Sequence, residues 1–168
     1  SLLAVNDLVR SSLGLVGAQL RARQIEVSCE LMDLLPPVHA NRYALEEVLL
    51  NLLTNARDAL GAREDTRAAQ PRRVTLRTST RDHRGTAVTQ IEVIDNGVGI
   101  APDLMERVQE PFFTTKDPQA GSGLGLTVCR SLLGECDGEL ELESTHGEGT
   151  IARVRLPAAT DAGEDGAP

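Results

Sequence analysis

Two asparagines, Asn51 and Asn55, lie four residues apart in the segment LEEVLLNLLTNARDAL. Helical spacing puts them on one face, opposite a stripe of leucine and valine. An amide oxygen is a hard, neutral ligand. Mg²⁺ bound to a triphosphate keeps several waters, so one amide can complete its coordination. Two solvated amides on an amphipathic helix are the alternative, and only the neighbouring motifs can decide between them.

A carboxylate ends the next motif, IEVIDNGVGI, in which Asp95 precedes Gly97 and Gly99. A simple turn accounts for these residues. The same carboxylate, beside backbone that can approach a flat ring closely, could also accept a hydrogen bond from the amino group of adenine. Guanine would present an oxygen there, and two acceptors repel each other.

The third motif is the glycine run GSGLGL, residues 121–126, which leads into a predicted helix. Backbone amides freed by glycine near a positive helix end can bind phosphate. The run is neither a P-loop nor a dinucleotide-binding fingerprint, and the HRD and DFG motifs of protein kinases are absent. The segment FFTTK precedes it and holds both phenylalanines of the chain, Phe112 and Phe113. Judged from the residues alone, the two rings could serve as a staple between a short helix and the sheet.

Hydrophobic periodicity predicts the elements that must position these motifs. The predicted helices cover residues 2–22, 42–62, 101–108 and 124–136, and the predicted strands cover 25–31, 74–80, 87–95, 138–145 and 150–157. Residues 81–86 are predicted to form a hairpin loop. The pattern predicts an α+β fold, a two-layer α/β sandwich whose helices cover one face of a mixed, mostly antiparallel sheet. The predicted buried stripe of the 42–62 helix is Leu45, Val48, Leu49, Leu52, Leu53 and Ala56.

The composition sets the class of protein. The chain has 168 residues, 40% of them hydrophobic, and a net charge of −8, which argues against a nucleic-acid partner. The basic clusters PRR and RDHR are interpreted as solvated loop ends. Three cysteines without CxxC spacing predict small buried thiols in a reducing compartment, and three separated histidines argue against a metal cluster. Without an apolar run of 18 residues, a cytoplasmic piece of a longer protein is expected, with no direct membrane contact.

Five motifs occur in one order: NxxxN, DxGxG, FFTTK, GxGLGL and a final GEGT at residues 147–150. This pattern resembles the ATP-binding catalytic domain of sensor histidine kinases, with the GHKL or Bergerat fold, over residues 3–157. FFTTK close before the glycine run resembles the nitrogen-regulation type in particular. The resemblance implies a protein histidine kinase that uses ATP and Mg²⁺.

The resemblance also implies roles for single residues. Asn55 would be the Mg²⁺ ligand, with Asn51 lining the same site, and Lys116 would contact the terminal phosphate; these three are the candidate catalytic residues. Asp95 would bind the adenine amino group, with Thr150 supporting it through a water. The implied nucleotide-binding residues are Asn55, Arg57, Asp58, Asp95, Gly97, Gly99, Ile100, Phe113, Thr114, Thr115, Lys116, Gly121, Ser122, Gly123, Leu124, Gly125, Leu126 and Thr150. Residues 114–122 would form a mobile lid over the nucleotide, with Phe112 and Phe113 as anchors at its root.

Two departures from the family pattern matter. Many sensor kinases carry lysine three residues after the Mg²⁺ asparagine, where this chain has Asp58 preceded by Arg57. Contact with phosphate would therefore fall to Arg57 or Lys116. ATP-hydrolysing relatives carry a general-base glutamate at the position of Asn51. An amide cannot take a proton from water, which favours phosphoryl transfer to a protein over hydrolysis.

The resemblance implies an acceptor histidine on a separate dimerisation domain, and none of His39, His83 and His146 fits that role. The implied partners are the chain's own dimerisation domain and a response regulator, with an isolated monomer and a homodimeric parent, either soluble or membrane-anchored. Residues 1–22 are interpreted as a lead-in helix, 23–157 as the catalytic domain and 158–168 as a disordered tail. An anti-sigma-type serine kinase, a degenerate nucleotide-binding scaffold and a hydrolase are the alternatives.

Overall fold

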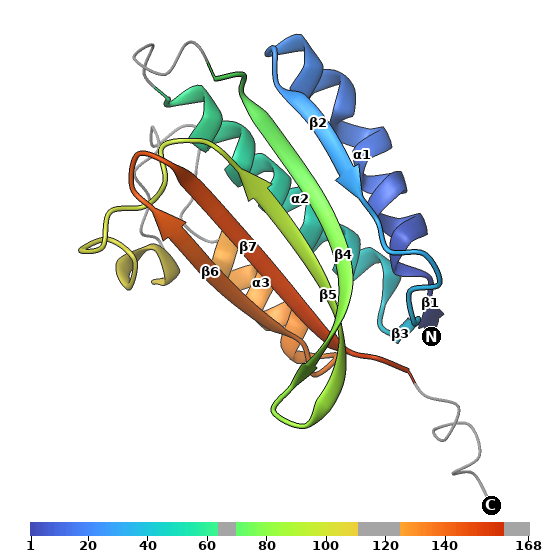
Figure 1. Ribbon diagram of the computed structural model, residues 1–168. Helices are drawn as coiled ribbons and strands as arrows, with labels where there is room; N and C mark the ends of the chain where they lie inside the picture. Colours follow the sequence, from blue (N-terminus) through green and yellow to red (C-terminus); the bar gives the residue numbers. More distant parts are fainter. Residues whose placement is uncertain (64–69, 111–124, 160–168) are drawn as a thin grey trace, which may run out of the picture.

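The computed structural model describes residues 1–63, 70–110 and 125–159. In chain order the elements are β1 (Leu2–Leu3), α1 (Val5–Ala22), β2 (Glu26–Glu30), β3 (Val38–His39), α2 (Arg42–Gly61), β4 (Arg73–His83), β5 (Thr86–Asp95), the 3-10 helix η2 (Arg107–Gln109), α3 (Gly125–Gly134), β6 (Glu139–Thr145) and β7 (Gly149–Pro157). Figure 1 shows the three α-helices against one face of a twisted sheet. The predicted two-layer α/β sandwich is confirmed.

The main sheet has five strands in the order β2-β4-β5-β7-β6. β2 pairs in parallel with β4, whereas the β4–β5, β5–β7 and β7–β6 pairs are antiparallel. The two predicted hairpins are therefore present, and the sheet is mixed, as expected. β1 and β3 pair separately as a two-stranded sheet, which the sequence pattern did not indicate because each has only two residues.

Helix α2 is the centre of the helical layer, packed against both α1 and α3. Its N-cap is Asn41, whose side-chain oxygen accepts hydrogen bonds from the backbone N–H groups of Tyr43 and Ala44 at 2.9 and 3.1 Å. Such a cap satisfies donors that the first helical turn leaves unpaired. Every residue of the predicted stripe is buried: Leu45, Val48, Leu49, Leu52, Leu53 and Ala56. The stripe thus turns the opposite, asparagine-bearing face of α2 away from the main core.

The two faces of the sheet differ in chemistry along the same strands. Toward the helices, paired positions on β5, β7 and β6 place Ile91, Val154 and Leu140 in one apolar row. On the open face, the next register places Glu92 beside Arg153 and Arg153 beside Glu141. Arg77 and Glu30 continue that row onto β4 and β2, so charge alternates in sign across five strands.

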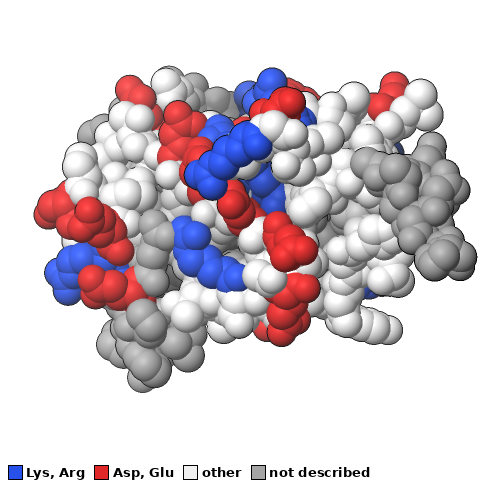
Figure 2. Space-filling model, turned by 90° about the horizontal axis from the view of Figure 1, so that it is seen from below, with Lys and Arg blue, Asp and Glu red and all other residues white. Residues whose placement is uncertain are grey.

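Glu92 is the buried member of this charged row, with its side chain only 6% exposed. A guanidinium nitrogen of Arg153 lies 3.1 Å from one of its oxygens and a nitrogen of Arg77 lies 3.9 Å from the other. Arg153 also pairs with Glu141 and Glu143 at 2.6 and 3.0 Å. Figure 2, a view from one end of the molecule, likewise shows acidic and basic side chains interspersed rather than separated into two patches.

Two local predictions were wrong. Residues 81–86 do not form a loop, because β4 continues to His83 and only Arg84 and Gly85 make the turn, with φ of 54° and 80°. Glycine allows this tight two-residue turn, and the Asp82 carboxylate accepts the Gly85 N–H at 3.0 Å. Residues 101–108 form turns and the start of η2 rather than an α-helix. A segment this short cannot offset the cost of helix nucleation without a larger buried face.

Two expectations about single side chains also need correction. Cys29 on β2 is exposed, although Cys129 is buried and Cys136 is half-buried; all three are free thiols. β2 is an edge strand, so its side chains have a neighbouring strand on one side only. Arg72 of the PRR cluster is half-buried rather than solvated, because its Nε donates to the Leu60 carbonyl at the end of α2, at 2.9 Å.

The two ends of the described chain meet at β3. β1 pairs with β3, Ala158 forms a β-bridge with Val38, and the Ala159 N–H donates to the Pro37 carbonyl at 2.8 Å. Residues 160–168, the greater part of the expected tail, lie outside the described residues. α1 contributes Val5 and Leu8 to the same core as α2, and the boundary proposed at residue 22 stays a prediction.

Candidate functional site

Asp95 ends β5 on the sheet face that packs against the helices, and it is only 8% exposed. Its Oδ1 accepts the backbone N–H of Gly97 at 2.9 Å, and the backbone N–H of Thr150 also hydrogen-bonds the carboxylate. Burial raises its pKa to about 6, against the two N–H donors, which act to lower it. The two N–H donors fix the position of the carboxylate, but burial leaves it poorly solvated. A hydrogen-bond donor from a bound ligand would therefore stabilise its charged form.

The glycine-containing turn after Asp95 is fixed between α2 and the turn that joins β6 to β7. The Val98 N–H donates to the Ala59 carbonyl of α2 at 3.2 Å, and the Val98 carbonyl in turn accepts the Gly147 N–H at 2.6 Å. A Cβ at Gly97 would lie 2.7 Å from the backbone of Ala59, and one at Gly99 would lie 2.2 Å from the Thr145 carbonyl. Glycine is required at both positions by close approach, and Gly99 also has φ of 70°.

Thr150 pairs with Asp95 across the β5–β7 ladder and with Ser144 across the β7–β6 ladder. The Ser144 hydroxyl lies 2.8 Å from the Thr150 hydroxyl and 2.9 Å from the Gly149 carbonyl, and it accepts the Ile100 N–H at 2.8 Å. On the helix-facing side of the sheet, the paired residues are apolar at Ile91 and polar at Asp95, Thr150 and Ser144, where the strands end. Three oxygen-bearing side chains line this end of the helix-facing surface.

The asparagine face of α2 meets the first turns of α3. A Cβ at Gly125 would lie 3.9 Å from Asn51 Oδ1, and the Asn51 side chain hydrogen-bonds the buried Cys129 thiol. Burial raises the pKa of that thiol to about 11, so Cys129 is neutral at physiological pH. Asn55, one turn further along α2, is half-buried. The face therefore points toward the helix that the glycine run precedes.

The remaining predicted residues divide into two groups. Arg57 and Asp58 are half-buried and pair with each other at 3.2 Å, while Leu126 packs against the core. The second group lies outside the described residues: Phe112, Phe113, Thr114, Thr115, Lys116, Gly121, Ser122, Gly123 and Leu124. The structure thus brings Asp95, Gly97, Gly99, Ile100 and Thr150 into one wall, and Asn51 and Gly125 into one contact.

Ser144 is the residue of this wall that sequence reasoning missed. The signal that could have found it is the alternation of GELELEST, in which Leu140 and Leu142 face the helices and the next such position is Ser144. A polar side chain in an apolar series at a strand end indicates either the strand's exit into solvent or a polar partner. Only the pairing of β6 with β7 tells the two apart.

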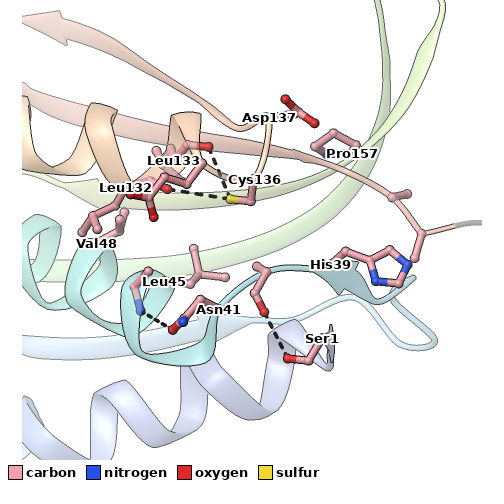
Figure 3. A pocket seen from close by; sticks show the side chains of 15 residues that line it. Ser1, His39, Asn41, Leu45, Val48, Leu132, Leu133, Cys136, Asp137 and Pro157 are labelled. Carbon is pink, nitrogen blue, oxygen red and sulfur yellow. Dashed lines mark hydrogen bonds between the residues drawn. The ribbon is translucent and has the colours of Figure 1, made fainter.

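A separate pocket of about 520 Å³ lies between the start of α2 and the end of α3. Figure 3 shows Leu45, Val48 and Leu133 on its inner side, with His39 and Asp137 toward its edge. No residue of the wall around Asp95 lines it. We therefore do not assign it to the same site.

Among the described residues, no group of three or more His, Cys, Asp or Glu side chains is arranged to hold a metal ion. In the same part of the chain, no helix combines the length and the hydropathy needed to cross a bilayer. The fold offers the hydroxyl oxygens of Thr150 and Ser144 beside Asp95, and the half-buried Asn51 and Asn55 of α2 offer neutral amide oxygens. Such oxygens suit Mg²⁺ carried by a triphosphate, which brings its own anionic ligands.

Comparison with known proteins gives the family. Residues 40–160 match the family described as histidine kinase-, DNA gyrase B- and HSP90-like ATPase. The two-component sensor PprA of Pseudomonas aeruginosa is 42% identical over 151 residues, which is 90% of this chain and 16% of that protein. The sensory histidine kinase/phosphatase NtrB of Rhizobium meliloti is 40% identical over 145 residues, which is 82% of this chain and 36% of NtrB. The chain thus spans a minor part of each relative.

Solved structures agree with this assignment. The nucleotide-free catalytic domain of the histidine kinase ThkA superposes with a TM-score of 0.75 at 26% identity, covering 95% of this chain and 98% of that one. Full-length ShkA in complex with AMPPNP gives a TM-score of 0.77 at 26% identity, covering 95% of this chain and 31% of ShkA. The family expected from the five motifs is confirmed: this chain belongs to the histidine kinase-, DNA gyrase B- and HSP90-like ATPases.

Proposed function

We propose that this chain is the catalytic domain of a sensor histidine kinase, which binds Mg-ATP and phosphorylates a histidine on a separate dimerisation domain. The observation that carries the proposal is Asp95, a buried carboxylate held by the N–H groups of Gly97 and Thr150. It faces the helical layer at the end of the sheet where the asparagine face of α2 also lies. Relatives named as two-component sensors and sensor histidine kinases support the assignment.

The base would be recognised at Asp95. The ionised carboxylate accepts a hydrogen bond from the amino group of adenine, and a charged hydrogen bond of this kind contributes about 1.5–3 kcal/mol. Gly97 and Gly99 hold the turn after Asp95 tightly against α2 and the β6–β7 turn, because a Cβ at either would strike backbone there, and this packing would fix the backbone beside the base. A 6-oxo purine would set its oxygen against the carboxylate and be disfavoured.

The phosphates would lie toward Asn51, Asn55 and the start of α3. Asn55 would supply the amide oxygen to Mg²⁺, and the metal would neutralise charge on the phosphates when bound. The positive end of α3 begins at Gly125, beside Asn51, and its backbone N–H groups would stabilise phosphate oxygens. Lys116 and Arg57 stay proposed as phosphate contacts.

The reaction proposed is an in-line transfer. A nitrogen lone pair of the acceptor imidazole forms the bond to the γ-phosphorus, and the bond from that phosphorus to the bridging oxygen breaks with its electron pair leaving on ADP. Asn51 occupies the position from which a glutamate would activate water, and an amide cannot accept that proton. Transfer to a protein acceptor is therefore favoured over hydrolysis.

The test is to extend the chain upstream by a few tens of residues of the parent protein and add ATP labelled at the γ-phosphate with Mg²⁺. Label on the protein that is lost in acid and stable in base would be phosphohistidine, as the proposal requires. Acid-stable label would indicate a serine kinase, free phosphate alone a hydrolase, and nucleotide binding without either product a scaffold. The Asp95→Asn variant of the extended chain is the control and should remain unlabelled.

The proposed partners follow from the same reasoning. A response regulator would receive the phosphoryl group from the histidine, and the parent protein would be a homodimer whose catalytic domains lie in the cytoplasm, whether or not another segment anchors it to a membrane. Mixing the labelled extended chain with candidate response regulators should move label from histidine to the regulator. Loss of label from the first protein with no gain on the second would contradict this step.

A further inference from the structure

Ser144 occupies the end of a row of paired residues, Asp95 on β5, Thr150 on β7 and Ser144 on β6. All three side chains lie on the sheet face that packs against the helices. Ser144 is half-buried and does not contact the position expected for a base, since Thr150 lies between it and Asp95 in the register. Any effect of Ser144 on a bound base must therefore act through the wall residues that it hydrogen-bonds, Thr150 and Ile100.

The hydrogen bonds of Ser144 can be assigned by counting hydrogens. A serine hydroxyl has one hydrogen and two lone pairs. The Gly149 carbonyl, 2.9 Å away, can only accept, so it takes the Ser144 hydrogen. The Ile100 N–H, at 2.8 Å, can only donate and uses one lone pair. The second lone pair then accepts the hydrogen of Thr150, whose oxygen lies at 2.8 Å.

This assignment shows whether Thr150 presents a hydrogen-bond donor or an acceptor to the space beside Asp95. The Thr150 hydroxyl has used its only hydrogen on Ser144, so its oxygen presents lone pairs, like the carboxylate of Asp95. The neighbouring backbone donors are also used within the fold: the N–H groups of Gly97 and Thr150 by Asp95, and that of Val98 by Ala59. These particular N–H groups are therefore engaged within the fold, while Asp95 and Thr150 present acceptors.

We propose that Ser144 is a specificity-determining residue that locks Thr150 as a hydrogen-bond acceptor, so that the wall selects purines with a 6-amino group over purines with a 6-oxo group. The inference rests on the proposed function, since it assumes that a base binds beside Asp95. An exocyclic amino group brings hydrogens that these acceptors can receive directly. A 6-oxo group brings another acceptor and would meet the lone pairs of Asp95 and Thr150.

The experiment measures dissociation constants for Mg-ATP and Mg-ITP, which carry 6-amino and 6-oxo purines, on this chain and its variants. In Ser144→Ala the Thr150 hydrogen is released and can donate to a 6-oxo group. The effect is that of one hydrogen bond, the one between the Ser144 and Thr150 hydroxyl groups. The preference for ATP over ITP should therefore fall about fivefold, chiefly because ITP binds more tightly. Ser144→Cys, whose thiol accepts weakly, should shift the preference in the same direction by less, and serves if the alanine variant does not fold.

Three further variants separate this role from a merely structural one. Ser144→Thr keeps the hydroxyl and should restore the wild-type preference. Adding Thr150→Val to Ser144→Ala removes the released hydrogen and should also restore it, although ATP then binds more weakly. Thr145→Ala, an exposed neighbour on the same strand, is the matched control and should leave both constants unchanged.

The outcomes distinguish the inference from the proposed function. If wild type binds neither nucleotide, or shows no preference for ATP, adenine recognition at Asp95 fails. If wild type prefers ATP and Ser144→Ala weakens both nucleotides by the same factor, Ser144 is only structural and the inference is wrong while the function stands. A relaxed preference that persists in the double variant would also overturn it, because the released hydrogen could not then be the cause.

Discussion

Replacing Asp95 by asparagine should change stability and nucleotide binding in opposite directions. Burial raises the pKa of this carboxyl group from 3.8 to about 6. The ionised carboxylate is therefore less stable in the folded chain than in the unfolded chain. At about 1.4 kcal/mol per pKa unit, this costs the nucleotide-free fold about 3 kcal/mol above pH 6. The cost falls as the pH drops below 6 and is lost below the ordinary pKa of 3.8, where both states are protonated.

Asparagine is close in size and carries no charge, so it removes this cost. It keeps one acceptor oxygen for the Gly97 N–H, but it serves the Thr150 N–H less well, which returns about 1 kcal/mol. We therefore expect Asp95→Asn to raise the free energy of unfolding by about 2 kcal/mol at pH 8. The gain should vanish near pH 4. In the same variant the affinity for Mg-ATP should fall by at least about tenfold, because a charged hydrogen bond to the adenine amino group is lost.

Urea denaturation of the nucleotide-free proteins at pH 8 and pH 4, with calorimetric titration of Mg-ATP at pH 8, measures both effects. The matched control is Asp103→Asn, which changes an exposed carboxylate and should alter neither quantity. A variant that is less stable at pH 8 would refute the assigned desolvation of Asp95. Unchanged affinity for ATP would refute its role in binding adenine.

Three other predictions test the site and its frame. In wild type the affinity for Mg-ATP should fall as the pH drops below about 6, where Asp95 becomes protonated, and calorimetry should show a shallower dependence in Asp95→Asn, which retains only the titration of the phosphates. Asn55→Ala should remove most of the difference between ATP affinities measured with Mg²⁺ and with EDTA; an equal difference in wild type and variant would mean that Asn55 is not the ligand. Glu92→Ala leaves the half-buried Arg153 without its most buried partner and should lower the free energy of unfolding by about 3 kcal/mol. The control Glu143→Ala removes an exposed partner of the same arginine and should cost less than about 1 kcal/mol. Equal urea midpoints for the two variants would contradict a stabilising role for the buried pair.

The sequence pattern was informative where one physical signal dominated. The apolar stripe of α2 predicted that helix and its buried face, and hydrophobic periodicity predicted the strands β6 and β7. Asp95 was singled out as a carboxylate at a strand end beside two glycines, and the order of the five motifs favoured a nucleotide-binding role over a simple turn. The stripe, the periodicity and the strand-end carboxylate are local signals, and each can be detected within about ten residues.

Other features depend on contacts that no local pattern encodes. Residues 101–108 have a helical composition, yet their few half-buried side chains do not stabilise an α-helix. Ser144 looks like an ordinary strand serine until β6 is paired with β7 and Ile100 is placed against it. Asn51 was predicted to line the metal site, and its contact with Cys129 depends on how α3 packs against α2. The segment 111–124, with FFTTK and most of the glycine run, lies outside the described residues, so its predicted roles stay predictions.

β1 and residues 158–159 meet at β3, and this junction lies far from Asp95 along the sheet. The Ala158 N–H donates to the Ala87 carbonyl near one end of β5, and Asp95 stands at the other. At about 3.3 Å per residue, these points are separated by roughly 25 Å. A rigid rotation of about 20° at the β3 junction would therefore carry Asp95 through an arc of roughly 9 Å at this strand spacing. If the proposed function holds, a rotation of this kind would move a nucleotide held beside Asp95 toward an acceptor or away from it, with the sheet itself moving as one body.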